Sequence, residues 1–142
     1  MQPILFLLLA VSTHSVVVEV DTTFKCPLSH WCWKASFIEI DTFIDDTLNK
    51  PIWECSTKPS ETRTYGGKQN GDGWFNNYLD LGFKIFHNCT SFGNNEIVVR
   101  EYDTPQFASV SIKEKYAKFE QEVKLLNRGK TPNYPPPIEV HD

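Results

Sequence analysis

The sequence is poor in positive charge and in long hydrophobic runs. Its 142 residues include 14 lysines and arginines against 18 acidic residues, which gives a net charge of −4. The basic residues form no cluster, and we therefore expect no nucleic-acid partner, because phosphate binding requires a basic surface. The apolar run at 4–11 is too short to cross a bilayer, so the sequence predicts a protein that does not span the membrane.

This short apolar run is typical of a secretory leader. Small residues follow it, and cleavage after Ser15 places Thr13 and Ser15 at the small-residue positions, with Ser12 as a rival site. We expect residues 1–15 to be a signal peptide and the mature protein to be secreted and extracellular.

Cysteine is also scarce, and its spacing excludes one class of site. The four cysteines contain no CxxC pair, and the four histidines are scattered, so the sequence predicts no zinc site, no other metal site and no cofactor. An even number of cysteines in a small secreted chain predicts two disulfides, and three connectivities are possible. The cysteines are Cys26, Cys32, Cys55 and Cys89.

What the chain does contain is a series of short apolar alternations. Residues 16–26 alternate cleanly and predict a half-buried strand. Further strands are expected at 33–43, 52–55 and 96–102. Residues 107–126 fit either strands or a helical stripe.

The most legible stretch is 71–89. Asp72-Gly73 before an alternating run predicts a hairpin turn. A strand follows to Leu81, a break is expected at Leu81-Gly82, and a second strand runs from Phe83 to Cys89 with Ile85 and His87 on one face.

These patterns predict an all-β fold, a β-sandwich of about seven strands in two sheets. The domain is expected at 16–128. Within it 49–70 is interpreted as irregular, with loops at Lys58-Pro59 and Gly66-Gly67. The Pro-rich tail 129–142 has little to bury, and we expect it to run extended over the surface or to be disordered.

The sequence resembles the nematode transthyretin-like family of secreted proteins. The segment 83–89, Phe-Lys-Ile-Phe-His-Asn-Cys, is similar to the Leu-x-Ile-Tyr-His-Asp-Cys motif of that family, and Gly73-Trp74-Phe75 resembles its Gly-x-Phe segment. The acidic run 45–48 resembles its acidic turn. The resemblance covers roughly 16–126 and implies a transthyretin-type sandwich without a cofactor, with 119–126 as strand.

The departures from that family suggest how the cysteines pair. Cys26 and Cys89 match the family, whereas Cys32 and Cys55 are additional, and Cys55 lies in an apparent insertion at 49–70. The resemblance therefore implies a Cys26–Cys89 bridge and a Cys32–Cys55 bridge.

Few residues suggest catalysis or ion binding. His87 near Cys89 invites a Cys–His catalytic interpretation, but a bridged cysteine has no thiolate, and we expect a hydrogen-bonded core histidine instead. Asp41, Asp45 and Asp46 lack the dense oxygen pattern of a calcium loop and predict a solvated acidic turn. No catalytic residue is assigned.

Two surface features remain. Asn88-Cys89-Thr90 is a sequon, which predicts glycosylation at Asn88. Trp31, Trp53 and Tyr65 either fill the core around the second bridge or form an exposed aromatic patch that binds a partner.

Three functions are compatible with these features. The preferred one is a secreted, non-enzymatic binding or bridging protein whose partner is an extracellular or cell-surface protein, a lipid or a small apolar ligand. A hydrolase related to 5-hydroxyisourate hydrolase is an alternative, but the chain ends at 137–142 without the Tyr-Arg-Gly-Ser tail that this resemblance requires. The third is a self-associating extracellular structural protein.

Overall fold

The structure, a computed structural model, describes residues 15–41, 44–70, 77–91 and 98–141. Within these residues the chain forms nine strands and no helix, as the all-β expectation required. The expected signal peptide and the Asp72-Gly73 turn lie outside the described residues, except that Ser15 already belongs to the first strand. The described part contains no helix long and apolar enough to cross a membrane.

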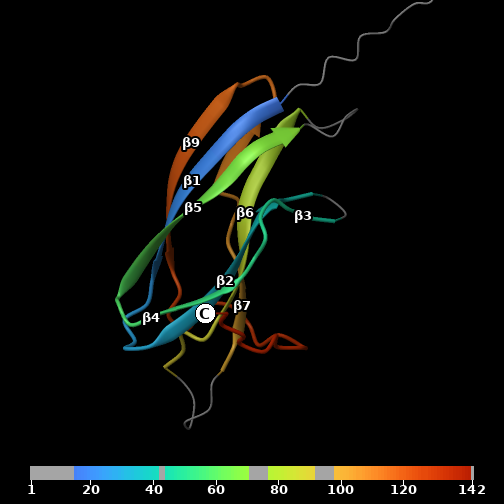
Figure 1. Ribbon diagram of the computed structural model, residues 1–142. Helices are drawn as coiled ribbons and strands as arrows, with labels where there is room; N and C mark the ends of the chain where they lie inside the picture. Colours follow the sequence, from blue (N-terminus) through green and yellow to red (C-terminus); the bar gives the residue numbers. More distant parts are fainter. Residues whose placement is uncertain (1–14, 42–43, 71–76, 92–97, 142) are drawn as a thin grey trace, which may run out of the picture.

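The strands form two sheets that face one another (Figure 1). The three-stranded sheet has the order β5-β1-β9, where β1 is Ser15–Lys25, β5 is Ser60–Asn70 and β9 is Tyr116–Lys124. β1 pairs with β5 in antiparallel and with β9 in parallel orientation. The last strand of the chain therefore lies beside the first.

The second sheet has six strands built around β2 (Trp31–Glu39) and β6 (Tyr78–His87), which pair in antiparallel orientation. β3 (Asp46–Thr47) and β4 (Trp53–Ser56) pair with β2. β7 (Arg100–Asp103) and β8 (Ala108–Ser111) pair with β6.

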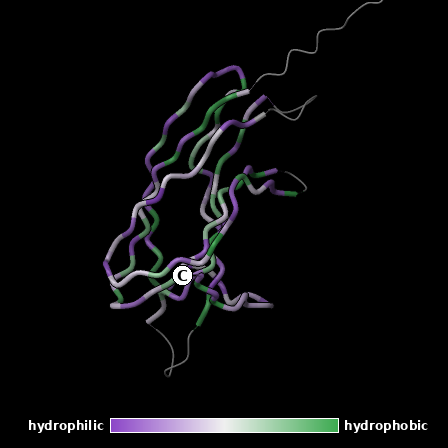
Figure 2. The backbone as a smooth tube through the Cα atoms, in the orientation of Figure 1, coloured by the Kyte–Doolittle hydropathy of each residue, from purple (hydrophilic) through white to green (hydrophobic). Residues whose placement is uncertain are grey.

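An aromatic core joins the two sheets. The ring of Phe83 on β6 lies 6.2 Å from Phe24 on β1 and 5.1 Å from Tyr65 on β5, centroid to centroid. Edge-on arrangements of this kind suit the charge distribution of aromatic rings. Alternation places these side chains inward: the tube in Figure 2 changes repeatedly between hydrophobic and hydrophilic along the strands.

Two disulfides constrain the fold, one between the sheets and one within the six-stranded sheet. Cys26, just after β1, is bonded to Cys89, just after β6, and both are buried. Cys32 on β2 is bonded to Cys55 on β4, its direct cross-strand neighbour. This is the pairing that the family resemblance implied, and no described cysteine is free.

The expected break at Leu81-Gly82 is wrong, because β6 runs through it. Buried residues continue in the same phase from Leu79 through Leu81 and Phe83 to His87, so no residue is left over to break the strand. A Cβ at Gly82 would point to the opposite face of β6, where the side chain of Ile40 lies against this glycine.

The interpretation of 49–70 as irregular is also wrong. Its second half is the 11-residue strand β5, which includes Lys68 and both Gly66 and Gly67. β5 and β6 belong to different sheets and do not pair with one another, so the chain passes from one sheet to the other between them. The sequence of β5 is typical of a loop because one of its faces is exposed and therefore polar, and because it contains two glycines.

The remaining boundaries shift for physical reasons. β2 begins at Trp31 rather than at the expected residue 33, because its first residues pair with β4. It ends at Glu39, before the expected end at residue 43. The strand expected at 96–102 appears as Arg100–Asp103, since residues 98–99 are not paired. The ambiguous 107–126 contains two strands, β8 and β9, rather than a helix.

Candidate functional site

A partly apolar groove lies at the end of the six-stranded sheet, beside the Cys32–Cys55 bridge. We call it the disulfide groove. Its volume is about 620 Å³, which falls within the range of small-ligand sites. Its lining comes from five separate parts of the chain: Leu28, His30, Cys32, Cys55, Asn88, Thr90, Val98, Ile138 and Val140.

The floor of the disulfide groove is the paired start of β2 with β4. β2 and β4 pair over four positions, from Trp31 opposite Ser56 to Lys34 opposite Trp53, and this pairing sets the two cysteines side by side. The indole Nε1 of Trp31 donates a hydrogen bond of 2.7 Å to the carbonyl of Lys58, which fixes the chain after β4.

Asn88 fastens a second wall to this floor. Its side-chain Oδ1 accepts a hydrogen bond of 2.7 Å from the backbone N–H of Cys32, and its own N–H donates to the Cys32 carbonyl at 3.1 Å. The N–H of Thr90 then donates to the Asn88 carbonyl at 2.8 Å. The half-buried Asn88 is thus part of the groove wall, and glycosylation there stays a prediction.

The C-terminal tail supplies the third wall. Lys130 exchanges two backbone hydrogen bonds with Glu101 on β7, and Pro132 is buried. Ile138 and Val140 then line the groove, and the C-terminal segment lies near β2 and β4 (Figure 1). Apart from Pro132 the tail buries little, since Tyr134 is 92% and Val140 50% exposed, and it runs over the surface of the domain, which was one of the two expected alternatives.

The predicted aromatic patch does not exist as an exposed surface. Trp31 is fully buried, Trp53 is 6% exposed, and Tyr65 is partly buried against the core. Trp31 stacks on Trp33 with ring centroids 4.7 Å apart, and burial raises the pKa of Tyr65 to about 12. These rings face inward because the segment that carries Trp53 and Tyr65 is built of strands, so the core alternative is the one that the structure supports.

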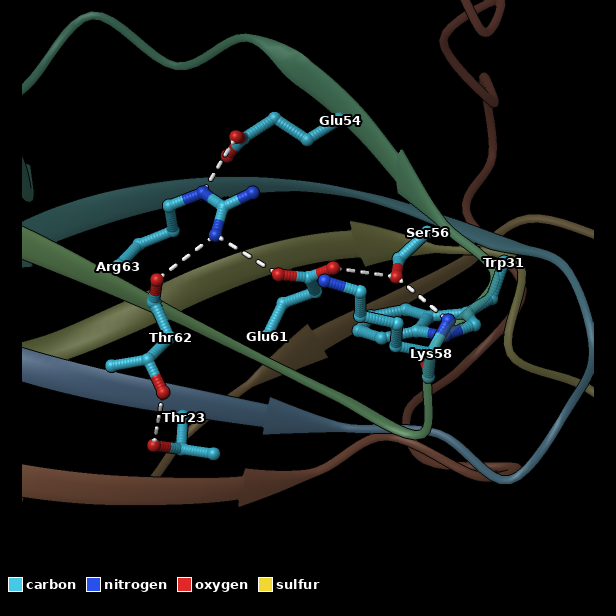
Figure 3. Close-up of polar contacts among 8 residues, drawn as sticks. All are labelled: Thr23, Trp31, Glu54, Ser56, Lys58, Glu61, Thr62 and Arg63. Carbon is cyan, nitrogen blue, oxygen red and sulfur yellow. Dashed lines mark hydrogen bonds and ion pairs between the residues drawn. The ribbon is translucent and has the colours of Figure 1, made fainter.

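A polar network covers the crossing from β4 to β5 (Figure 3). The Arg63 guanidinium contacts Glu54 at 2.8 Å and Glu61 at 3.2 Å. The Ser56 hydroxyl donates to Glu61 at 2.7 Å, and this hydrogen bond together with Arg63 lowers the pKa of Glu61. The backbone N–H of Lys58 donates to the Ser56 hydroxyl at 2.9 Å.

Arg63 is the centre of this network. Arg63 also lies over the Trp33 ring, 5.4 Å from its centroid, which is a cation–π distance. Because the guanidinium bridges Glu54 on β4 and Glu61 on β5, the network fixes the path between the two sheets.

His87 has a structural position rather than a catalytic one. Its ring is buried, its Nδ1 accepts a hydrogen bond of 3.1 Å from the N–H of Cys89, and its Nε2 donates one of 3.0 Å to the carbonyl of Arg128. These partners select the neutral ring with the proton on Nε2, and burial lowers the pKa of His87 to about 4. Cys89 is bridged, so the pair lacks the free thiol that nucleophilic catalysis needs.

The acidic residues near β3 are exposed. Asp41, Asp45 and Asp46 are exposed, and the Asp45 carboxylate accepts a hydrogen bond of 3.0 Å from the backbone N–H of Asp41. Within the described ranges, the group of metal-ligating side chains that lies close enough to share an ion is His30, Cys32 and Cys55. In this structure the disulfide occupies both sulfurs.

Comparison with known proteins gives the chain a family. The family model described as "Caenorhabditis elegans protein of unknown function (DUF870)" matches residues 21–134. The chain belongs to this family. The DUF870 match includes the strands from β2 to β9 and the start of the tail, but it does not extend to Ile138 or Val140.

One similar protein is the Caenorhabditis elegans "Uncharacterized protein B0416.7". It is 34% identical over 70 residues, which cover 49% of this chain and 51% of the relative. The chain thus spans about half the length of this curated relative. No solved structure matches.

The sequence had identified the bridge and Asn88 but not the rest of the disulfide groove. The 28–30 segment, Thr90, Val98 and Ile138 are far apart in the sequence, and no local pattern links them. The one available signal was His30-x-Cys32 at the start of a strand, where alternation puts both residues on the same side.

Proposed function

We propose that this protein is a secreted, extracellular, non-enzymatic binding protein with a transthyretin-like sandwich, and that the disulfide groove holds a small apolar ligand. The observation that carries the proposal is the groove itself, with Leu28, Val98, Ile138 and Val140 beside a few polar groups. Sites for small molecules commonly combine an apolar lining with a small number of placed hydrogen-bonding groups.

The lining defines the ligand more closely. Its apolar part suits a hydrocarbon body, whereas His30, Asn88 and Thr90 offer hydrogen bonds to one polar group. We therefore propose a small amphipathic molecule over a cell-surface protein, for which the described residues offer no comparable exposed aromatic patch.

Several features support the other parts of the proposal. Two disulfides are consistent with an extracellular protein, because such bonds persist in oxidising compartments. Two facing sheets support a sandwich of the transthyretin type. The buried, neutral His87 and the bridged Cys89 support a binding role over a hydrolytic one.

A fluorescent amphipathic probe tests the groove. We expect anilinonaphthalene sulfonate to bind the full chain with enhanced emission, and Ile138→Asp to weaken binding at least about tenfold, because a carboxylate in an apolar wall is costly. Ile44→Asp is the matched control, since Ile44 is 77% exposed and does not line the groove.

Thermal unfolding of both variants checks that the fold is intact. Equal probe binding by wild type and Ile138→Asp would contradict the groove as the site. Binding to lipid vesicles without any binding of the probe in solution would also overturn the proposal and favour a membrane-surface partner.

A further inference from the structure

We propose that the Cys32–Cys55 bridge is reducible, and that its two thiols then form a metal site with His30. The ligand would be a thiophilic ion such as Zn²⁺, for which two thiolates and one imidazole are familiar ligands. The ligand atoms of His30, Cys32 and Cys55 lie within 4.8 Å of one another. Tetrahedral zinc requires ligand separations of roughly 3.5–3.8 Å, which side-chain rotation provides.

Access distinguishes this bridge from the other. Cys55 is only partly buried, whereas its partner Cys32 is 2% exposed, and both sulfur-bearing residues line the disulfide groove. Cys26 is 1% and Cys89 0% exposed, and both belong to the core between the sheets. Thiol–disulfide exchange requires approach to a sulfur atom, so an external thiol reaches Cys32–Cys55 first.

The backbone keeps the thiols together after reduction. Cys32 and Cys55 are direct neighbours in the β2–β4 pairing, which has a pair on either side of them. The hydrogen bond that the Cys32 N–H donates to Asn88 Oδ1 and the one that Trp31 Nε1 donates to the Lys58 carbonyl do not involve sulfur. Two thiols held in this way lose little further freedom when an ion binds, which favours binding.

The reaction balances with a dithiol as the reductant. One dithiol supplies two electrons and two protons: the Cys32–Cys55 sulfur–sulfur bond breaks, two protein thiols form, and the dithiol closes to its own disulfide. The metal ion then replaces the two thiol protons, which pass to the buffer. His30 binds through a neutral ring nitrogen, and the fourth position opens to the groove, where water occupies it.

Cobalt absorption after selective reduction tests this site. The full chain with both bridges is treated with dithiothreitol, desalted without oxygen and titrated with Co²⁺. We expect thiolate-to-cobalt absorption at one ion per chain, which Zn²⁺ abolishes. Alkylation and peptide mapping should label Cys32 and Cys55 but not Cys26 or Cys89. The oxidised protein should give no such band.

Variants separate the site from adventitious binding. His30→Ala should weaken Co²⁺ binding at least about tenfold, whereas His141→Ala, in the exposed tail, should leave it unchanged. The double variant Cys32→Ser/Cys55→Ser should abolish the band. The near-ultraviolet circular dichroism signal of this variant shows whether the fold persists without the bridge. The proposal is overturned by loss of that signal, by reduction of Cys26–Cys89 at the same rate, by absence of the band, or by equal affinity in His30→Ala.

Discussion

At the scale of single residues, His87 shows how burial determines the chemistry of a side chain. The sequence correctly predicted that it faces inward with Ile85, because alternation along a strand is a local property. Its two hydrogen-bond partners were not predictable together. Cys89 is nearby in sequence, but Arg128 comes from the far end of the domain. The folded protein holds this ring neutral, with a pKa of about 4.

Acid should therefore destabilise the protein through His87. An unfolded histidine takes up a proton near pH 6.5, whereas the folded one does so only near pH 4. The stabilisation is complete above pH 6.5 and is lost as the pH falls from 6.5 to 4, by about 3 kcal/mol. Urea unfolding at several pH values measures this loss.

The matched variants for that measurement are His87→Gln and His30→Ala. We expect His87→Gln to be less stable at pH 7.5 and to lose the steep decline between pH 6.5 and 4. His30 is exposed, so His30→Ala should retain the decline of the wild type. A wild-type curve that is flat across this range would refute the assignment.

At the scale of elements, β5 shows where sequence patterns fail. Polar alternation with two adjacent glycines is typical of a loop, yet β1 pairs with every residue of β5. The pairing is a tertiary effect, because β1 is the neighbour and lies far away in sequence. β1 itself was predictable, since Val16, Val18 and Val20 alternate with polar residues.

The two glycines of β5 should differ in their tolerance of a side chain. Both have positive φ, 125° for Gly66 and 146° for Gly67. A Cβ at Gly66 would collide with the backbone carbonyl of Val18, whereas a Cβ at Gly67 meets no atom within 4 Å. We expect Gly67→Ala to cost roughly 1–2 kcal/mol and Gly66→Ala more than about 3 kcal/mol. Chemical denaturation measures both, and equal losses would contradict this packing.

At the scale of the whole molecule, the two bridges differ in what they constrain. Cys26–Cys89 joins the two sheets and spans 63 residues, whereas Cys32–Cys55 joins two neighbouring strands of one sheet and spans 23. The sequence alone left three connectivities open, and only the family resemblance selected one. The disulfide groove was beyond prediction, because it requires the tail to return to β2 and β4.

Removal of each bridge should reveal this difference. In the chain-entropy account, loops of these lengths correspond to about 4 kcal/mol for Cys26–Cys89 and about 3 kcal/mol for Cys32–Cys55. Cys26→Ala/Cys89→Ala should therefore be the less stable double variant, and it also loses a link within the core. The free energy of unfolding in urea measures both, and a reversed order would show that loop length does not govern their effect.

The parallel pairing of β1 with β9 has a consequence for the order of assembly during synthesis. Val17 lies opposite Tyr116, so the central strand of its sheet waits for a neighbour made roughly a hundred residues later. Both cysteines of the inter-sheet bridge are made before β9, and β5 is already present to cover one side of β1. The growing chain can thus close its covalent link around an incomplete sheet, and the final strand completes it by adding to an edge that is already in place.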